Sequence, residues 1–213
     1  MKRLIALLAT VVGLSMVPAV YAEATPASSP DPAPSVAVTD TRMALRDLWV
    51  EHVFWTRDYA VANQQGEKAA AAVAADEVVA NAKAIAASIA PLYGDAGADQ
   101  LLTLLAGHWG AVKQYSDATV ASNSADQNAA QKALTDNAAA LADFLSTANP
   151  YLPRDTLFSL LVAHGGHHVS QINELKAGDY AAEAKTWHAM RKHILAISDA
   201  LTKALAKQFP EKF

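Results

Sequence analysis

Three histidines recur at a fixed interval along this 213-residue chain, and their imidazole side chains can bind metal ions. His52, His108 and His164 are separated by 56 residues each. Each histidine follows leucine or tryptophan at minus seven, minus four and minus three, which is the spacing of an apolar helical face. Neutral imidazole is a ligand of Zn, Cu, Fe and Ni. The fixed period indicates one supersecondary unit copied three times.

A second polar position follows each of these histidines by 29 residues. It is occupied by Asn81, Asn137 and His193, again on apolar helical faces. Turn-forming residues lie near the midpoint of each interval, so the two members of a pair should stand at the same height in an antiparallel hairpin. If three hairpins pack about a common axis, the three histidines converge. If the hairpins stack side by side, separate His–Asn, His–Asn and His–His pairs form, and the pattern leaves both open.

Two sets of metal ligands follow from these arrangements. The converging arrangement predicts His52, His108 and His164 as the ligands. The local arrangement predicts His164, His168 and His193, because His164 and His168 are four residues apart on one helix and His193 faces them across the hairpin. The implied cofactor is a transition metal ion (Zn, Cu, Ni or Fe).

Asn81 and Asn137 are expected to support His52 and His108. A buried imidazole or amide needs a hydrogen-bond partner, because an unsatisfied one costs about 1–3 kcal/mol. Each asparagine could therefore orient the second ring nitrogen of a metal-binding histidine. It could equally bond the histidine in a polar layer that only fixes the register of the helices.

Two glycines beside His164 destabilise the predicted helix, so their presence needs an explanation. Gly165 and Gly166 each destabilise a helix by roughly 1 kcal/mol relative to alanine. Their presence favours a close approach of the backbone by another helix or by a ligand, and a plain packing contact would explain it nearly as well.

The elements that must position these residues are helices joined by short turns. Gly, Pro, Asn, Asp or Ser occurs at every predicted turn, and no alternating strand pattern is sustained. The fold class is therefore all-α, as an up-down bundle of six helices built from three repeated α-hairpins. We predict the helices at residues 41–65, 68–91, 97–121, 125–148, 154–177 and 180–208.

The beginning of the chain has the composition of a targeting segment. Residues 1–22 combine a basic start with an apolar run and small residues before a cut after Ala22, which predicts a secretory signal peptide. Residues 23–40 are rich in Pro, Ala and Ser and predict a flexible linker, so that the bundle domain covers residues 41–213. A periplasmic or secreted protein without a membrane span in its mature form is expected.

Composition and motifs exclude several classes of function. The chain has no Cys, which excludes disulfides, thiolate metal sites and c-type haem attachment. Its formal net charge is −4, and about −6 without Lys2 and Arg3, so a nucleic-acid partner is not expected. It has no His-Glu-x-x-His zinc hydrolase signature, no Glu-x-x-His pair and no nucleotide-binding loop. We therefore expect a protein that is not an enzyme.

Four stretches carry a resemblance to a known group of proteins. They are LWVEHVFWTR (48–57), the LL-x-x-H-like pattern ending at His108, NAAALADFLSTANPYL (137–152) and the closing QFPEKF (208–213). With these the chain resembles a poorly characterised group of bacterial secreted all-helical proteins, found mostly among Bacillus-type organisms. The resemblance implies the six-helix fold and implies no activity. The additional His167, His168 and His188 depart from that group's pattern.

These observations predict a helical-bundle protein outside the cytoplasm that binds a divalent transition metal through inward-facing histidines, for sequestration, delivery or sensing. Two alternatives remain open at this point. One is a non-catalytic structural or interaction module with an unknown protein partner, whose His/Asn layer only fixes helix register. The other is a carrier of a small molecule or of haem.

Overall fold

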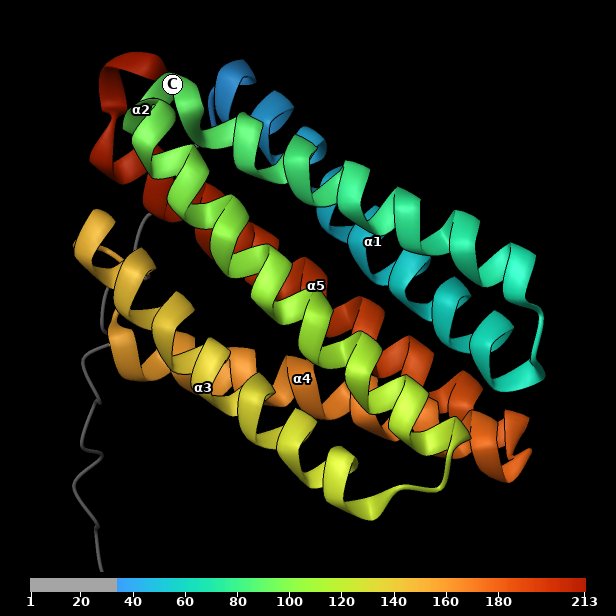
Figure 1. The fold of residues 1–213 in the computed structure, drawn as a ribbon. Helices are drawn as coiled ribbons and strands as arrows, with labels where there is room; N and C mark the ends of the chain where they lie inside the picture. The colour runs from blue at the N-terminus through green and yellow to red at the C-terminus, as the bar shows by residue number, and fades with distance from the viewer. Residues whose placement is uncertain (1–33) are drawn as a thin grey trace, which may run out of the picture. The chain divides into compact units, whose positions relative to one another are not determined.

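Every regular element between residues 34 and 213, the part of the chain that this computed structural model describes, is helical (Figure 1). These residues contain no strand, in agreement with the predicted all-α class. The predicted signal peptide and residues 23–33 of the predicted linker lie outside the described residues. The helices are α1 (Val36–Gln65), α2 (Lys68–Val120), α3 (Ser124–Ala148), α4 (Arg154–Ala177) and α5 (Tyr180–Gln208), followed by the 3₁₀ turn η1 (Pro210–Lys212).

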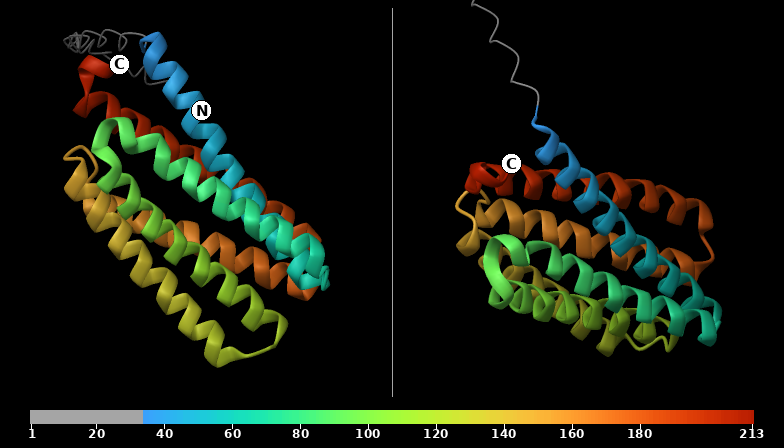
Figure 2. Two further views of the ribbon diagram at one scale, coloured as in Figure 1. Left: turned by 45° about the horizontal axis from the view of Figure 1, so that its top comes forward. Right: turned by 90° about the horizontal axis from the view of Figure 1, so that it is seen from above.

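The number of helices differs from the prediction of six in three repeated hairpins, because the described residues form five α-helices. Residues 68–91 and 97–121, predicted as separate helices, belong to α2, which is kinked at Gly94. Gly94 has φ 73° and ψ 174°, a backbone conformation that is essentially restricted to glycine. The chain therefore turns within helical structure instead of in a separate loop, and Figures 1 and 2 show the two arms of α2 (residues 68–93 and 95–120) running antiparallel.

Helix α1 begins earlier than predicted. It starts at Val36, so residues 36–40 of the predicted linker are helical. Ser35 is the N-cap, and its hydroxyl oxygen accepts a hydrogen bond from the Val38 amide at 3.1 Å. The same hydroxyl donates to the carbonyl oxygen of Phe213 at 2.9 Å, which ties the start of α1 to the end of the chain.

The remaining helix ends lie within a residue or two of the predicted ones. Gly66 and Gly178 end α1 and α4 in the left-handed conformation, with φ of 78° and 71°, and their amides bond back to the last turn of the helix. Asn123 caps α3, and Asp179 caps α5 through its side chain. Local turn and capping chemistry therefore accounts for where the helices stop.

Helix α4 packs against each of the other four α-helices, and α1 packs against three of them. α1 packs against α2, α4 and α5, and α4 packs against α1, α2, α3 and α5 (Figure 2). Leu45, Leu101 and Leu157, each seven residues before one of the three periodic histidines, are all buried in the core. None of the described helices is both long and apolar enough to cross a membrane.

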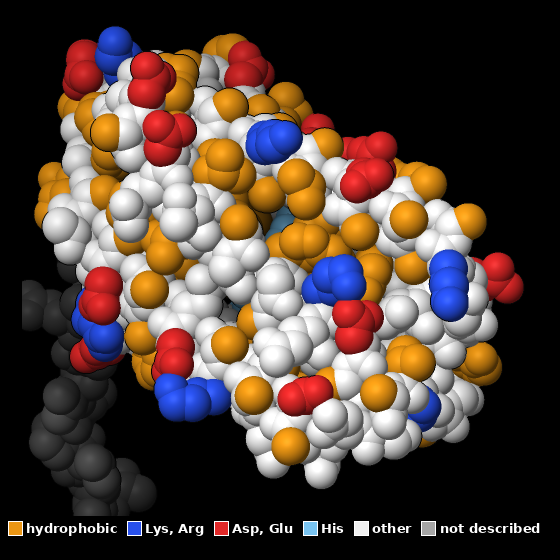
Figure 3. Space-filling view, viewed as in Figure 1, with side chains coloured by type: hydrophobic (Ala, Val, Ile, Leu, Met, Phe, Trp, Pro, Cys, Tyr) orange, Lys and Arg blue, Asp and Glu red, His pale blue; other side chains and the backbone are white. Residues whose placement is uncertain are grey.

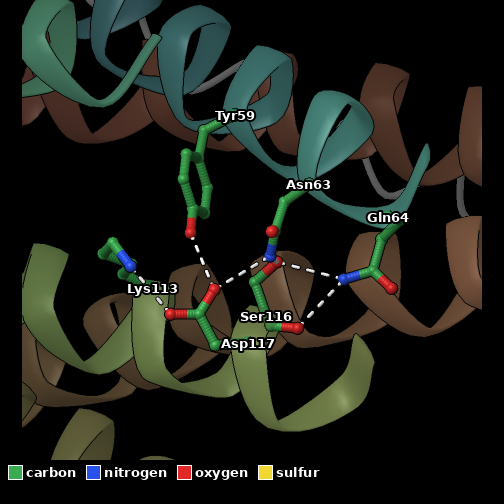
Figure 4. A network of polar contacts seen from close by, with 6 residues as sticks. All are labelled: Tyr59, Asn63, Gln64, Lys113, Ser116 and Asp117. Atoms are coloured by element: carbon green, nitrogen blue, oxygen red, sulfur yellow. Dashed lines mark hydrogen bonds and ion pairs between the residues drawn. The ribbon is translucent and has the colours of Figure 1, made fainter. Parts of the chain in front are cut away.

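A polar network holds α1 against the second arm of α2 about two turns beyond His52 (Figure 4). The Tyr59 hydroxyl donates to Asp117 Oδ1 at 2.9 Å, Asn63 Nδ2 donates to the same oxygen at 3.0 Å, and Lys113 Nζ bonds Asp117 Oδ2 at 2.7 Å. Burial of the phenol and its bond to Asp117 raise the pKa of Tyr59 to about 12. Tyr59 therefore stays protonated at neutral pH and can donate to Asp117. The network fixes the relative height of α1 and the second arm of α2.

The face of the bundle shown in Figure 3 carries scattered charges of both signs, without a single-sign patch. Histidine atoms are visible on this face only at the bottom of a narrow gap between other side chains. This distribution is that of a solvated surface covering a histidine-containing interior.

Candidate metal centre

Four histidines from three helices meet inside the bundle. They are His52 of α1, His108 of the second arm of α2, and His164 and His168 of α4. Each offers one ring nitrogen, and the four nitrogens all lie within 4.8 Å of one another. Between 3% and 7% of each residue is exposed, so the cluster is closed off from bulk solvent.

The helical period places each histidine in the interior. His52 shares its face with Leu45, Thr56 and Tyr59, all of which are buried. The Thr56 hydroxyl donates to the His52 carbonyl oxygen at 2.8 Å, so it does not compete for the imidazole. The packing of α1 against both α2 and α4 then brings the three histidine-bearing faces together.

The distances show a tight cluster of rings. The ring centroids of His52, His108 and His164 are 5.4–5.8 Å apart in each pairing. His168 lies 4.6 Å from His164 in an edge-to-face arrangement, and their Nε2 atoms are 3.1 Å apart. Two nitrogens bound to one tetrahedral zinc ion stand about 3.3–3.4 Å apart, given Zn–N bonds near 2.0–2.1 Å. The contact between His164 and His168 is a hydrogen bond between the two rings in the metal-free protein, and its length is already close to the separation that a zinc ion requires.

All four imidazoles are neutral at pH 7, because burial disfavours their charged form. Burial, with a smaller contribution from His108, lowers the pKa of His52 to about 3, and burial lowers the pKa of His108 to about 4. Burial and the neighbouring histidines place the pKa values of His164 and His168 well below 6.5. A neutral imidazole has one nitrogen with a free lone pair, which is the form that binds a metal ion.

Several ring nitrogens of the cluster have no hydrogen-bond partner among the described residues. Within residues 34–213, His52 Nδ1, His108 Nε2 and His164 Nδ1 are buried without a hydrogen-bond partner. The candidate ligand set contains imidazoles alone and no carboxylate. Its chemistry therefore suits a transition metal ion and does not suit Mg²⁺ or Ca²⁺, which require oxygen ligands.

The two asparagines lie next to the cluster but not in the expected role. Asn81 Nδ2 donates to the Leu48 carbonyl oxygen at 3.0 Å, and Asn137 Nδ2 donates to the Leu104 carbonyl oxygen at 2.9 Å. The prediction that these amides bond or orient the rings of His52 and His108 is not supported, because their donors bond backbone carbonyls one turn earlier. They hold the neighbouring helix at the height of the histidines.

His193 takes the equivalent position in the third unit. Its Nε2 lies 2.9 Å from the Leu160 carbonyl oxygen, and the separation of 33 residues between the partners is the same in all three cases. The His193 ring is stacked 6.3 Å from His164, and it is not one of the four clustered histidines. His193 therefore replaces an asparagine at a helix contact and stands beside the cluster.

The structure combines the two ligand sets that the sequence predicts. It brings together the converging set, and it adds His168 from the local set while leaving His193 outside. The signal for His168 was its spacing of four residues from His164, which was assigned only to the local arrangement. The expected close approach at the glycine pair is absent, since a Cβ on Gly165 would meet only Leu134 at 3.9 Å and one on Gly166 would meet nothing within 4 Å.

A cavity of about 80 Å³ adjoins the cluster. His52, His108 and His164 form part of its wall, together with the Asn137 side chain. The rest of the lining is mainly apolar and includes Leu105, Leu141, Phe144, Leu161 and Ile197. Three of the four clustered histidines therefore border a mainly apolar cavity.

Comparison with known proteins gives no independent indication of function. The chain matches no protein family, no curated protein and no solved structure with which it was compared.

Proposed function

We propose that this protein binds one divalent transition metal ion through His52, His108, His164 and His168, and that it serves metal sequestration, delivery or sensing outside the cytoplasm. The observation that carries the proposal is the convergence of four buried, neutral imidazoles from three helices, with one ring nitrogen of each within 4.8 Å of the others. The location outside the cytoplasm rests on the targeting-like composition of residues 1–22.

The ligand chemistry supports an ion of the Zn, Cu or Ni type. Nitrogen ligands without thiolates or carboxylates match the preference of these ions for imidazole. The shift of each pKa below 6.5 means that no proton has to be displaced from the histidines at neutral pH. Metal binding here is therefore expected to release few protons at pH 7.

A purely architectural polar layer explains the cluster less well. Each buried polar atom without a partner costs about 1–3 kcal/mol, and three ring nitrogens of the cluster are in that position. The helix register is already determined by the amide–carbonyl bonds of Asn81 and Asn137 and by the bond from His193. A metal ion would accept one ring lone pair from each of the four histidines, a function that the architectural layer does not give them.

The test is elemental analysis of the untagged full chain together with thermal melting. We expect close to one equivalent of Zn, Cu or Ni per chain after purification or reconstitution. At a free metal concentration a hundred times the Kd, the ion should stabilise the fold by about 2.7 kcal/mol, and EDTA should reverse this gain.

The matched variants are His52→Leu/His164→Leu and His188→Gln. The first replaces two buried imidazoles by apolar groups of similar size and should fold while losing the metal. The second changes an exposed histidine and should retain it. If the unaltered chain takes up no ion and its melting is insensitive to both EDTA and added metal, the architectural interpretation stands in place of ours.

A second candidate is a carrier of a small apolar molecule, which the cavity beside the cluster favours. Dry apolar cavities of related size bind xenon or benzene. Haem is a poor fit to the same space, since pockets for ligands of drug size begin at about 300 Å³. The carrier predicts binding of xenon or benzene that is unaffected by EDTA.

A further inference from the structure

A fifth and a sixth histidine continue the row of imidazoles from the buried cluster toward the surface. The ring of His193 in α5 is nearly parallel to that of His164, with a centroid distance of 6.3 Å and an interplanar angle of 13°. The ring of His167 in α4 lies 5.4 Å from His193 in an edge-to-face arrangement. Both residues are half-buried, whereas His164 is buried. The pair therefore stands between solvent and the cluster.

The hydrogen bond made by His193 determines which of its nitrogens is free. Its Nε2 lies 2.9 Å from the Leu160 carbonyl oxygen, and a carbonyl oxygen only accepts. Nε2 must therefore carry the proton, which leaves the lone pair on Nδ1. A histidine held in this way by a backbone carbonyl is in the tautomer of a typical metal ligand.

The same position in the other two units shows that an imidazole is not needed for the helix contact. Asn81 and Asn137 make the equivalent bond with an amide donor. Unlike the two asparagines, His193 also has a ring nitrogen with a free lone pair. His167, the only other imidazole against this ring apart from His164 in the described part of the chain, offers a second one.

We propose that His167 and His193 form an outer metal site, at which a hydrated Zn²⁺, Cu²⁺ or Ni²⁺ ion is first captured and from which it passes to the buried four histidines. This inference rests on the proposed function and adds the route by which the ion enters. Two imidazoles leave most of the coordination sphere to water, so the ion stays exchangeable. Stepwise replacement of water by imidazole avoids moving a fully hydrated ion through the apolar wall of the bundle.

The test compares rates of Cu²⁺ uptake with the equilibrium amount bound. The full chain is mixed with Cu²⁺ in a stopped-flow instrument, and quenching of tryptophan fluorescence is followed, since the Trp49 ring lies 5.9 Å from the ring of His52. The variants are His193→Asn, which keeps a donor for the Leu160 carbonyl as in the other two units, and His167→Gln. The control is His188→Gln, an exposed histidine of α5.

We expect His193→Asn and His167→Gln to slow uptake by about tenfold or more, the scale on which groups around a metal site act. The final stoichiometry and the melting temperature of the metal-free variants should equal those of the unaltered chain, and His188→Gln should load at the normal rate. Equal rates in all variants, or loss of an equivalent of bound metal in His193→Asn, would overturn the outer site alone. Absence of Cu²⁺ binding to the unaltered chain would instead overturn the proposed function and the outer site with it.

Discussion

The buried histidines predict how the stability of the metal-free protein depends on pH. Burial lowers the pKa of His52 to about 3 and that of His108 to about 4, against 6.5 for an unperturbed histidine. Between these values the unfolded chain binds protons that the folded chain does not. Stability is therefore full above about pH 6.5 and falls as the pH drops from there toward the folded pKa values.

The size of the effect follows from the printed shifts. Each such histidine lowers the free energy of unfolding by about 1.36 kcal/mol for every pH unit below 6.5, which amounts to about 2 kcal/mol at pH 5. His52 and His108 together should therefore remove about 4 kcal/mol between pH 7 and pH 5. His164 and His168 act in the same direction, since their pKa values are also lowered. The free energy of unfolding of a domain of this kind is about 5–15 kcal/mol in total, so the loss is large.

The assay is urea denaturation at pH 7 and pH 5 with EDTA present, an interval chosen because ordinary carboxylates stay ionised there. The His52→Leu variant has one titrating group fewer and should lose about 2 kcal/mol less than the unaltered chain over the same interval. The His188→Gln variant, altered at an exposed position, should follow the unaltered chain. An unaltered chain whose stability is the same at both pH values would refute the reasoning, as would an equal loss in His52→Leu.

Four further substitutions test the fold around the site by urea denaturation at pH 7. Arg57→Met removes the charged partner of Glu183, a carboxylate with 3% exposure that keeps only its hydrogen bond from Gln171. The change should cost about 2–3 kcal/mol, less than for a fully buried pair because Arg57 is partly exposed. Gly94→Ala should cost about 1–3 kcal/mol through backbone strain, whereas Gly166→Ala in open space should stabilise α4 by about 0.5–1 kcal/mol. Asn137→Ala removes the donor to a backbone carbonyl and should cost about 1 kcal/mol.

Each of these has an outcome that contradicts it. Full stability of Arg57→Met would mean that the Glu183 carboxylate takes up a proton or finds water when its partner is lost. A Gly94→Ala variant as stable as the Gly166→Ala variant would show that the kink does not need a positive φ. An Asn137→Ala variant with unchanged stability would remove the amide–carbonyl bond from the account of helix register.

Most of the helical architecture could be predicted from local sequence. Glycine at positions 66 and 178 and the caps at Asn123 and Asp179 act on their own neighbours along the chain, so the turns fell where the sequence placed them. The two errors in the elements are of the same local kind. Ser35 caps α1 five residues before the predicted end of the linker, and the single residue Gly94 reverses the chain where the sequence predicts a longer connection.

The sequence by itself determined which residues face inward, because the 3.6-residue period of a helix sorts every side chain onto an apolar or a polar face. It therefore determined that His52, His108 and His164 are buried at mid-height of their helices. It could not determine whether they meet, since hairpins packed about a common axis and hairpins stacked side by side bury the same faces. Only the tertiary structure decided this, through contacts of α1 and α4 with helices distant in sequence. The same contacts placed His168 inside the cluster and left His193 beside it, bound to a backbone carbonyl.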